Sequence, residues 1–247
     1  MSLRPLLAVI PARGGSKGLP RKNLLELAGI PLIAHSILFA KTCPEVDRCI
    51  VSTDSEEIAE VARRHGAEVP FLRSGELARD ESPTLPVLQD VLREMERIAG
   101  HRFESLLLLQ PTNPVRRPAS IREALAVVEA DNQAQGAVAV AEPPFNPRYV
   151  CVEESGGYLK FCFRQAYQRR QDAPTVYRIT GSLYVWRRDF LLSTDAPLGQ
   201  EARLKLVYEQ EPVIDIDTAE DLRLAELLLR AGLVRLPWLE HHAGHAR

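Results

Sequence analysis

The chain has 247 residues, of which 45% are hydrophobic and 26% charged, with 14 Gly and 18 Pro. This composition is typical of a globular protein and excludes a disordered chain, a collagen-like repeat and a small disulfide-rich scaffold. Because 31 basic residues face 33 acidic ones, the formal net charge of −2 argues against nucleic acid or an anionic membrane as a partner. The length predicts one domain over 1–247, since two full catalytic modules would not fit.

The four cysteines indicate a reducing compartment. Cys43, Cys49, Cys151 and Cys162 show neither a CxxC pair nor a metal-type spacing, and unpaired cysteines are usual inside cells. The apolar run near the N-terminus is only five or six residues long, too short for a signal peptide or a membrane span. We therefore expect a cytoplasmic protein that does not enter a membrane.

Strand and helix patterns alternate along the chain. Short continuous apolar runs predict strands buried on both faces at 6–10, 49–52, 106–109 and 137–140, and two further strands are expected at 182–186 and 213–216. Helical spacing of apolar residues predicts helices at 33–41, 58–65, 85–98, 121–128 and 218–230. The last of these opens with a capping-box pattern, Thr218 followed by Asp221. This alternation predicts an α/β fold whose mostly parallel sheet is covered on both faces.

Residues 142–180 break the alternation. They contain several prolines, a Gly156-Gly157 pair, and alternating apolar and polar residues around 158–163. These features predict an insertion that carries a β-hairpin.

The loop after the first strand, PARGGSKGLPRKN, has the features of a phosphate site. Adjacent glycines let the backbone present its N–H groups to an anion, and Arg13, Lys17 and Lys22 add positive charge. Gly-rich turns are common and basic residues are usually only solvated, but ligands bind open α/β sheets at the carboxyl ends of parallel strands. The position therefore favours phosphate binding, by a loop that is neither a Walker A nor a GxGxxG motif.

Two carboxylates, Asp215 and Asp217, lie two residues apart in VIDIDTAED. In a strand both would point to the same face, where they would repel each other unless a cation lay between them. Mg²⁺ is typically held by one or two carboxylates together with substrate phosphates. The alternative is that they cap the following helix or end a strand in solvent; beside a phosphate loop, the pair favours a metal–nucleotide site.

Four segments in chain order resemble the acylneuraminate cytidylyltransferases, also called CMP-sialic acid synthetases. They are ARGGSKGLPRKN, VSTDS at 51–55, LQPTNPVR at 109–116 and DIDTAEDL at 215–222. The resemblance runs from about residue 6 to residue 230 and implies a doubly wound sheet of nucleotidyltransferase type. It also implies that 142–180 is a small β-rich dimerisation insertion, which gives a homodimer and leaves open whether dimers pair further.

The same resemblance implies an activity. Members of the family transfer CMP from CTP to the anomeric hydroxyl of a 2-keto sugar acid, N-acetylneuraminate or a related nonulosonate, and release pyrophosphate. Residues expected to bind the nucleotide are Arg13, Ser16, Lys17, Lys22, Asn23, Arg73, the Ser82 backbone and the Thr84 hydroxyl.

The resemblance also assigns the remaining site residues, by their positions in the sequence. The sugar acid would contact Gln110, and the insertion would direct Arg148, Arg170 and Arg178 into the partner subunit's site. Asp215 and Asp217 would hold Mg²⁺. Lys17, Lys22 and Asp217 would act in catalysis, because both substrates are anions and their repulsion must be offset.

One position departs from the family pattern. The family usually has Asn before the glycine of its YRxNG stretch, whereas this chain reads YRITG with Thr180. Threonine is shorter than asparagine and lacks an amide donor, so the identity of the acyl groups on the sugar acid stays open.

Three alternative functions are disfavoured. The intact aspartate pair argues against a non-catalytic nucleotide-binding module, which has little need of a cation site. The sequences SKGLPRKN and LQPTNP favour a nonulosonate as the acceptor over the eight-carbon acid of lipopolysaccharide. A dinucleotide-dependent oxidoreductase is disfavoured because GxGxxG is missing.

Overall fold

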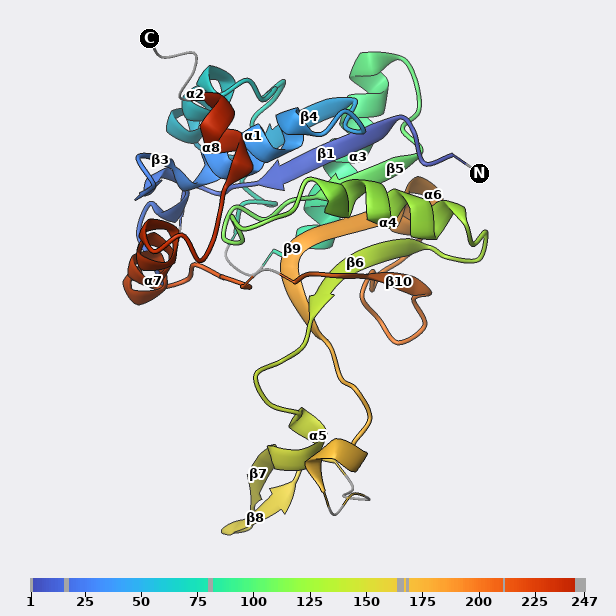
Figure 1. Ribbon diagram of the computed structural model, residues 1–247. Helices are drawn as coiled ribbons and strands as arrows, with labels where there is room; N and C mark the ends of the chain where they lie inside the picture. Colours follow the sequence, from blue (N-terminus) through green and yellow to red (C-terminus); the bar gives the residue numbers. More distant parts are fainter. Residues whose placement is uncertain are drawn as a thin grey trace.

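A six-stranded sheet forms the centre of the molecule (Figure 1). The computed structural model describes residues 2–15, 18–79, 82–163, 167, 169–210 and 212–242. The sheet order is β10-β6-β9-β5-β1-β4, with β1 Leu6–Pro11, β4 Arg48–Ser52, β5 Ser105–Leu108, β6 Gly136–Ala141, β9 Arg178–Arg187 and β10 Leu204–Tyr208. All neighbouring strands are parallel except those that pair with β9, which runs antiparallel to β5 and β6. The prediction of a mostly parallel sheet is confirmed.

Helices cover both faces of this sheet (Figure 1). One core cluster joins the strands to α1 Leu32–Thr42, α2 Glu56–Arg64, α4 Ala119–Glu129 and α8 Pro237–His242. The cluster on the other face contains α3 Thr84–Ala99 and α6 Arg188–Ser193. This two-sided cover explains why the strand sequences are almost continuously apolar. Within the described ranges, no helix has both the length and the apolar character needed to span a bilayer.

Local sequence signals fix the ends of two helices. The Ser55 hydroxyl accepts from the backbone N–H of Ile58 and caps α2. Helix α7, Ala219–Arg230, begins with the predicted capping box, in which Thr218 and Asp221 bond each other's backbone N–H groups. Such caps satisfy N–H groups that have no partner inside the helix.

The strand predicted at 213–216 is wrong. This segment is extended, but its backbone bonds a loop instead of a neighbouring strand: Ile216 N–H donates to the Thr112 carbonyl at 2.8 Å. The Asn113 amide likewise donates to the Ile214 carbonyl at 3.1 Å. The predicted alternation of side-chain direction is nevertheless present, since Ile214 and Ile216 are buried whereas Asp215 and Asp217 are exposed.

Several elements were not predicted. They are the edge strand β10, the short pair β2 Glu26–Leu27 and β3 Ile30–Pro31, the 3₁₀ turn η1 Lys22–Leu24, and helices α6 and α8. Strand β9 also begins four residues earlier than its apolar run at 182–186 indicates, at Arg178.

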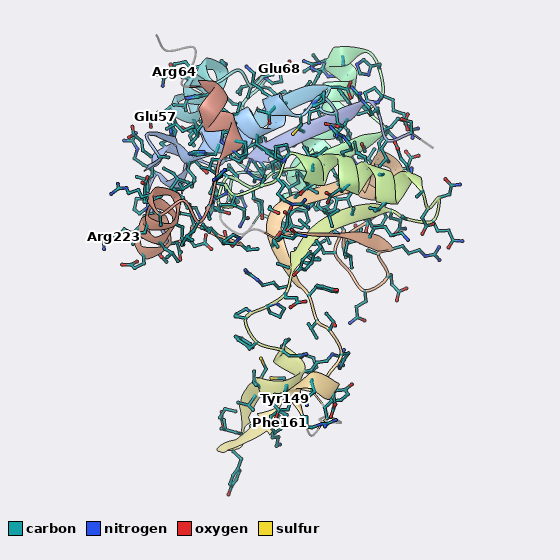
Figure 2. All side chains as sticks on the ribbon, viewed as in Figure 1. Glu57, Arg64, Glu68, Tyr149, Phe161 and Arg223 are labelled. Atoms are coloured by element: carbon teal, nitrogen blue, oxygen red, sulfur yellow. The ribbon has the colours of Figure 1, made fainter. Side chains whose placement is uncertain are left out.

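The segment between β6 and β9 forms an arm that stands away from the sheet (Figure 1). It contains α5 Pro147–Val150, β7 Val152–Ser155, β8 Tyr158–Phe161 and the 3₁₀ turn η2 Arg170–Asp172. Strands β7 and β8 form the predicted hairpin, and both turn glycines have positive φ, 63° at Gly156 and 82° at Gly157. Figure 2 shows Tyr149 and Phe161 in this arm, far from the sheet.

Candidate active site

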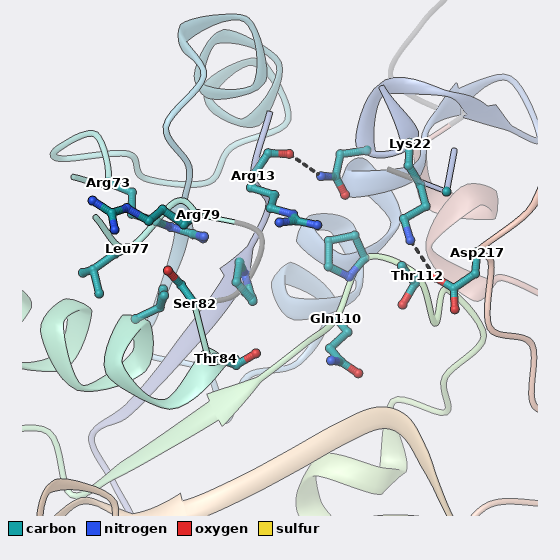
Figure 3. A pocket seen from close by; sticks show the side chains of 15 residues that line it. Arg13, Lys22, Arg73, Leu77, Arg79, Ser82, Thr84, Gln110, Thr112 and Asp217 are labelled. Carbon is teal, nitrogen blue, oxygen red and sulfur yellow. Dashed lines mark hydrogen bonds and ion pairs between the residues drawn. The ribbon is translucent and has the colours of Figure 1, made fainter. Parts of the chain in front are cut away.

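A pocket of about 460 Å³ opens at the carboxyl ends of β1 and β5. The chain continues from β1 to β4 on one side and reaches β5 on the other, so the strand order reverses here, as at the ligand sites of open α/β sheets. The pocket wall is formed by Pro11, Arg13, Gly18, Lys22, Asn23, Arg73, Leu77, Arg79, Ser82, Thr84, Val87, Gln110, Pro111, Thr112 and Asp217 (Figure 3). Eight of the predicted site residues are therefore brought together from segments far apart in the sequence.

The first loop is braced by Asp54. The backbone N–H of Gly14 donates to the Asp54 carboxylate at 2.8 Å. A Cβ atom added at Gly14 would lie 3.1 Å from the Cβ of Ser55, so glycine permits this close approach. Ser55 caps α2, whereas Asp54 holds the loop. The predicted phosphate ligands Ser16 and Lys17 lie outside the described residues.

Asn23 supports the same loop from within. Its side-chain amide donates to the Arg13 carbonyl at 3.1 Å, and the residue is buried. This bond fixes the backbone from which the Arg13 side chain enters the pocket. Figure 3 shows Arg13 between Arg73 on one side and Lys22 on the other. Asn23 thus lines the pocket as predicted and adds a contact that the sequence did not indicate.

Lys22 and Asp217 form an ion pair across the pocket, with Nζ and Oδ1 2.7 Å apart (Figure 3). The Lys22 side chain is 17% exposed and that of Asp217 67%. The first loop approaches this acidic segment closely, because a Cβ atom at Gly18 would lie 3.2 Å from the Asp217 carbonyl oxygen. A cation from the first loop and a carboxylate 195 residues later thus meet at one end of the pocket.

Asp215 lies beside this pair but does not line the pocket. Desolvation raises the pKa of the Asp215 carboxyl, the nearby Asp217 carboxylate raises it further, and a hydrogen bond from Thr112 opposes the increase. The positive charge of Lys22 also opposes the increase without cancelling it. Two such carboxylates form a donor set that suits Mg²⁺.

The donor set is nevertheless small. In the part of the chain that the structure describes, no cluster of three or more His, Cys, Asp or Glu side chains could hold a metal. A cation at Asp215 and Asp217 would therefore need its other ligands from water and substrate phosphates, as Mg²⁺ in nucleotide enzymes usually does.

The opposite end of the pocket is basic as well. Arg73 is held by Ser52, through Nε to the hydroxyl at 3.1 Å and through Nη2 to the carbonyl, and burial lowers the pKa of its guanidinium. Arg79, which sequence reasoning missed, also lines this wall (Figure 3); its only signal was its place in FLRSGELARDESPT. Three arginines and Lys22 therefore give the pocket a positive lining, suited to an anion.

Ser82 lies in the pocket wall, where its backbone N–H donates to the Arg79 carbonyl at 3.1 Å. Its hydroxyl donates to the Glu76 carbonyl at 2.8 Å. Both contacts close the turn that presents Arg79, so Ser82 shapes the pocket wall before α3 begins at Thr84.

Of the insertion's arginines, Arg148 and Arg178 do not line the pocket of their own chain. Arg148 lies in α5 on the arm, where its guanidinium carbon is 5.6 Å from the centroid of the Phe163 ring. Arg178 is exposed at the start of β9. Arg170 belongs to η2, and its side chain lies outside the described part of the structure.

Comparison with known proteins bears on this arrangement. A family model described as cytidylyltransferase matches residues 7–234. The chain belongs to this family. It is therefore a nucleotidyltransferase of the cytidylyltransferase type.

Individual relatives agree with the assignment. The chain is 36% identical over 225 residues to the CMP-N,N'-diacetyllegionaminic acid synthase of Legionella pneumophila, covering 91% of this chain and 96% of that protein. It is 30% identical over 220 residues to the N-acylneuraminate cytidylyltransferase of Escherichia coli, covering 89% of this chain and 51% of that protein. The solved structure of CMP:2-keto-3-deoxy-manno-octonic acid synthetase complexed with CTP has a TM-score of 0.69 at 20% identity, covering 92% of this chain and 99% of that one, which shows a shared fold.

Proposed function

We propose that this cytidylyltransferase transfers CMP from CTP to the anomeric hydroxyl of a nine-carbon 2-keto sugar acid, giving the CMP-sugar and pyrophosphate. The observation that carries the proposal is the convergence of Arg13, Lys22, Arg73 and Asp217 on one pocket at the strand-order reversal. Relatives named for legionaminic and neuraminic acids support the acceptor class.

The pocket residues would act by positioning and by charge. The sugar hydroxyl attacks the α-phosphorus in line, one P–O bond forms as the bond to pyrophosphate breaks, and the hydroxyl proton passes to solvent. Arg13 and Lys22, with Ser16 and Lys17 from the same loop, would hold the triphosphate and offset the repulsion between two anions. Arg73, Asn23, Ser82 and Thr84 would form the nucleoside end.

Asp215 and Asp217 would hold a magnesium ion, which would supply positive charge to the phosphates. Lys22 neutralises Asp217 in the single chain, with Nζ 2.7 Å from Oδ1. We infer that this ion pair loosens when substrate enters, because Lys22 then has phosphate oxygens as competing acceptors.

The arm would complete the site in a homodimer. Its apolar side chains are exposed in the single chain. Of the predicted sugar contacts whose side chains the structure describes, Gln110 alone lines the pocket. Arg148, Arg170 and Arg178 would then reach the sugar acid bound by a partner subunit. The four cysteines form no disulfide, which supports the expected cytoplasmic setting.

Pyrophosphate release tests the proposal. CTP or UTP would be combined with N-acetylneuraminate, a diacetylated legionaminate, pseudaminate or the eight-carbon acid, with Mg²⁺ present or chelated. We expect release with CTP, Mg²⁺ and a nine-carbon acid, and its loss in Lys22→Ala but not in Lys41→Ala, a lysine exposed on α1 outside the pocket. Release only with the eight-carbon acid would favour that alternative, and none with any acid would refute the proposal.

A further inference from the structure

Arg116 is a buried cation behind the pocket. The residue is 2% exposed, and no described carboxylate forms an ion pair with it. Burial lowers the pKa of its guanidinium to about 9, which leaves it charged at neutral pH. Because a desolvated charge is costly, its hydrogen bonds must be well placed.

Those hydrogen bonds join three separate elements. Nε donates to the Ser182 carbonyl in β9 at 2.6 Å, and Nη1 donates to the Ser36 hydroxyl in α1 at 3.0 Å. Nη2 donates to the main-chain carbonyl of Gln110, directly after β5. A planar guanidinium fixes these acceptors in one rigid geometry, which a lysine ammonium cannot reproduce.

The Gln110 side chain also lies close to β9, next to Gly181. Gly181 has φ +80°, and a Cβ atom there would lie 2.9 Å from Gln110 Oε1 and 2.3 Å from Asn113 Oδ1. Residues 181 and 182 therefore constrain both the side chain and the backbone of Gln110. Gly181 leaves room for the Gln110 amide oxygen, and Ser182 holds Arg116, which in turn bonds the Gln110 backbone. Gln110 lines the pocket between Thr84 and Thr112 (Figure 3).

We propose that Arg116 is a positioning residue for the acceptor, which orients Gln110 toward the sugar acid by tying its backbone to β9. The assignment rests on the proposed function, since it takes Gln110 as a sugar-acid contact. Arg116 itself is buried behind the wall and touches neither substrate.

Kinetics of Arg116→Lys test this role. We expect kcat/KM for the sugar acid to fall about 10- to 100-fold, because small misplacements of a contact cost this much, while CTP affinity measured by calorimetry stays unchanged. In Arg116→Lys/Gln110→Ala the loss should not exceed that of Gln110→Ala alone, because the lysine acts only through Gln110. The matched control is Ser36→Ala, which removes the contact to α1 and should lower thermal stability but not raise the acceptor KM.

If Arg116→Lys does not fold, Gly181→Ala provides a second test of the same role. It crowds the Gln110 amide directly and should also raise the acceptor KM without weakening CTP binding. The assignment is overturned if either folded variant keeps the wild-type kcat/KM for the sugar acid, or if the losses in the double variant multiply. A wild-type protein that binds CTP but uses no sugar acid would instead refute the proposed function, and this role with it.

Discussion

The pocket and the arm differ in how their side chains are held. All six residues of β6 are buried in the sheet, whereas all four residues of β8 are exposed, with Tyr158 77% and Leu159 74% accessible. Around the pocket, Asp54, Asn23 and Ser52 each fix a loop or side chain. The arm has a formed backbone but an uncovered apolar surface.

The two regions therefore differ in how far one chain completes them. The sheet brings the pocket residues together within a single chain. A two-stranded hairpin with an exposed apolar face is at best marginally stable in water, so the arm has a physical reason to pack against another surface. We expect variants in the two regions to fail in different ways.

The largest effect is expected in the pocket, for Asp217→Ala. Turnover should fall by about 10³ or more, since the variant removes a carboxylate of the proposed magnesium site. The unfolding temperature should hardly change, because the side chain is largely exposed. Near-normal kcat with magnesium would contradict the metal assignment; Asp131→Ala, which breaks an exposed ion pair with Lys205 outside the pocket, is the control.

Mixing two inactive variants tests whether the arm acts across the dimer. Lys22→Ala removes a pocket residue and Arg170→Ala a residue of the arm. If the arm completes the partner's site, random heterodimers should restore about a quarter of wild-type activity, because one site in each mixed dimer is intact. No recovery, in a mixture shown by mass spectrometry to contain heterodimers, would argue against a shared site.

The exposed surface of the arm should control association. The double variant Tyr158→Ser/Leu159→Ser should convert a dimer into monomers in analytical ultracentrifugation with little change in CTP binding, because it removes apolar area far from the pocket. Leu227→Ser is the matched control, since Leu227 is 63% exposed on α7. Equal dissociation by both variants would place the interface elsewhere.

A smaller effect is expected at Asp215, whose pKa is raised by desolvation and by Asp217. A raised carboxyl pKa destabilises the ionised native state, and this cost disappears as pH falls through the raised value. Asp215→Asn should therefore increase the unfolding temperature at neutral pH, by no more than about 2 °C, and lower activity. The gain should vanish in acid, where the wild-type carboxyl is itself protonated; a gain at all pH values would point to another cause.

The smallest effect on substrate choice is expected at Thr180. Its hydroxyl lies 2.8 Å from the Ser182 hydroxyl and donates to the Ala139 carbonyl at 3.2 Å, so it is turned into the sheet. Thr180→Val should cost about 1 kcal/mol of unfolding free energy and leave the ratio of kcat/KM between two sugar acids unchanged. A changed ratio would return this position to the acceptor site.

The sequence predicted best where one signal dominates. Continuous apolar runs marked β1, β4, β5 and β6, and Thr218 with Asp221 marked the start of α7. The strand at 213–216 failed because alternating burial does not reveal whether a neighbouring strand is present. Strand β10 was missed because LKLVY, at the sheet edge, is only partly buried and has no continuous apolar run.

Some site residues could be predicted from the sequence and others could not. Charged residues in distinctive segments, such as Lys22 and Asp217, could be named, because their chemistry requires a particular residue type. Arg79, Arg116 and the brace from Asp54 could not, since their roles depend on contacts between distant segments. Arg116 forms bonds 66 and 80 residues away, to Ser182 and Ser36.

The most direct test of the central claim follows the α-phosphorus. CTP carrying a labelled α-phosphate would be incubated with the enzyme, Mg²⁺ and a nine-carbon sugar acid, and the products separated by anion-exchange chromatography. The account predicts that the label appears in an acid-labile CMP-sugar, with one unlabelled pyrophosphate per labelled product. Label recovered only as free CMP, or left in CTP while the protein binds it, would contradict transfer to a sugar acid.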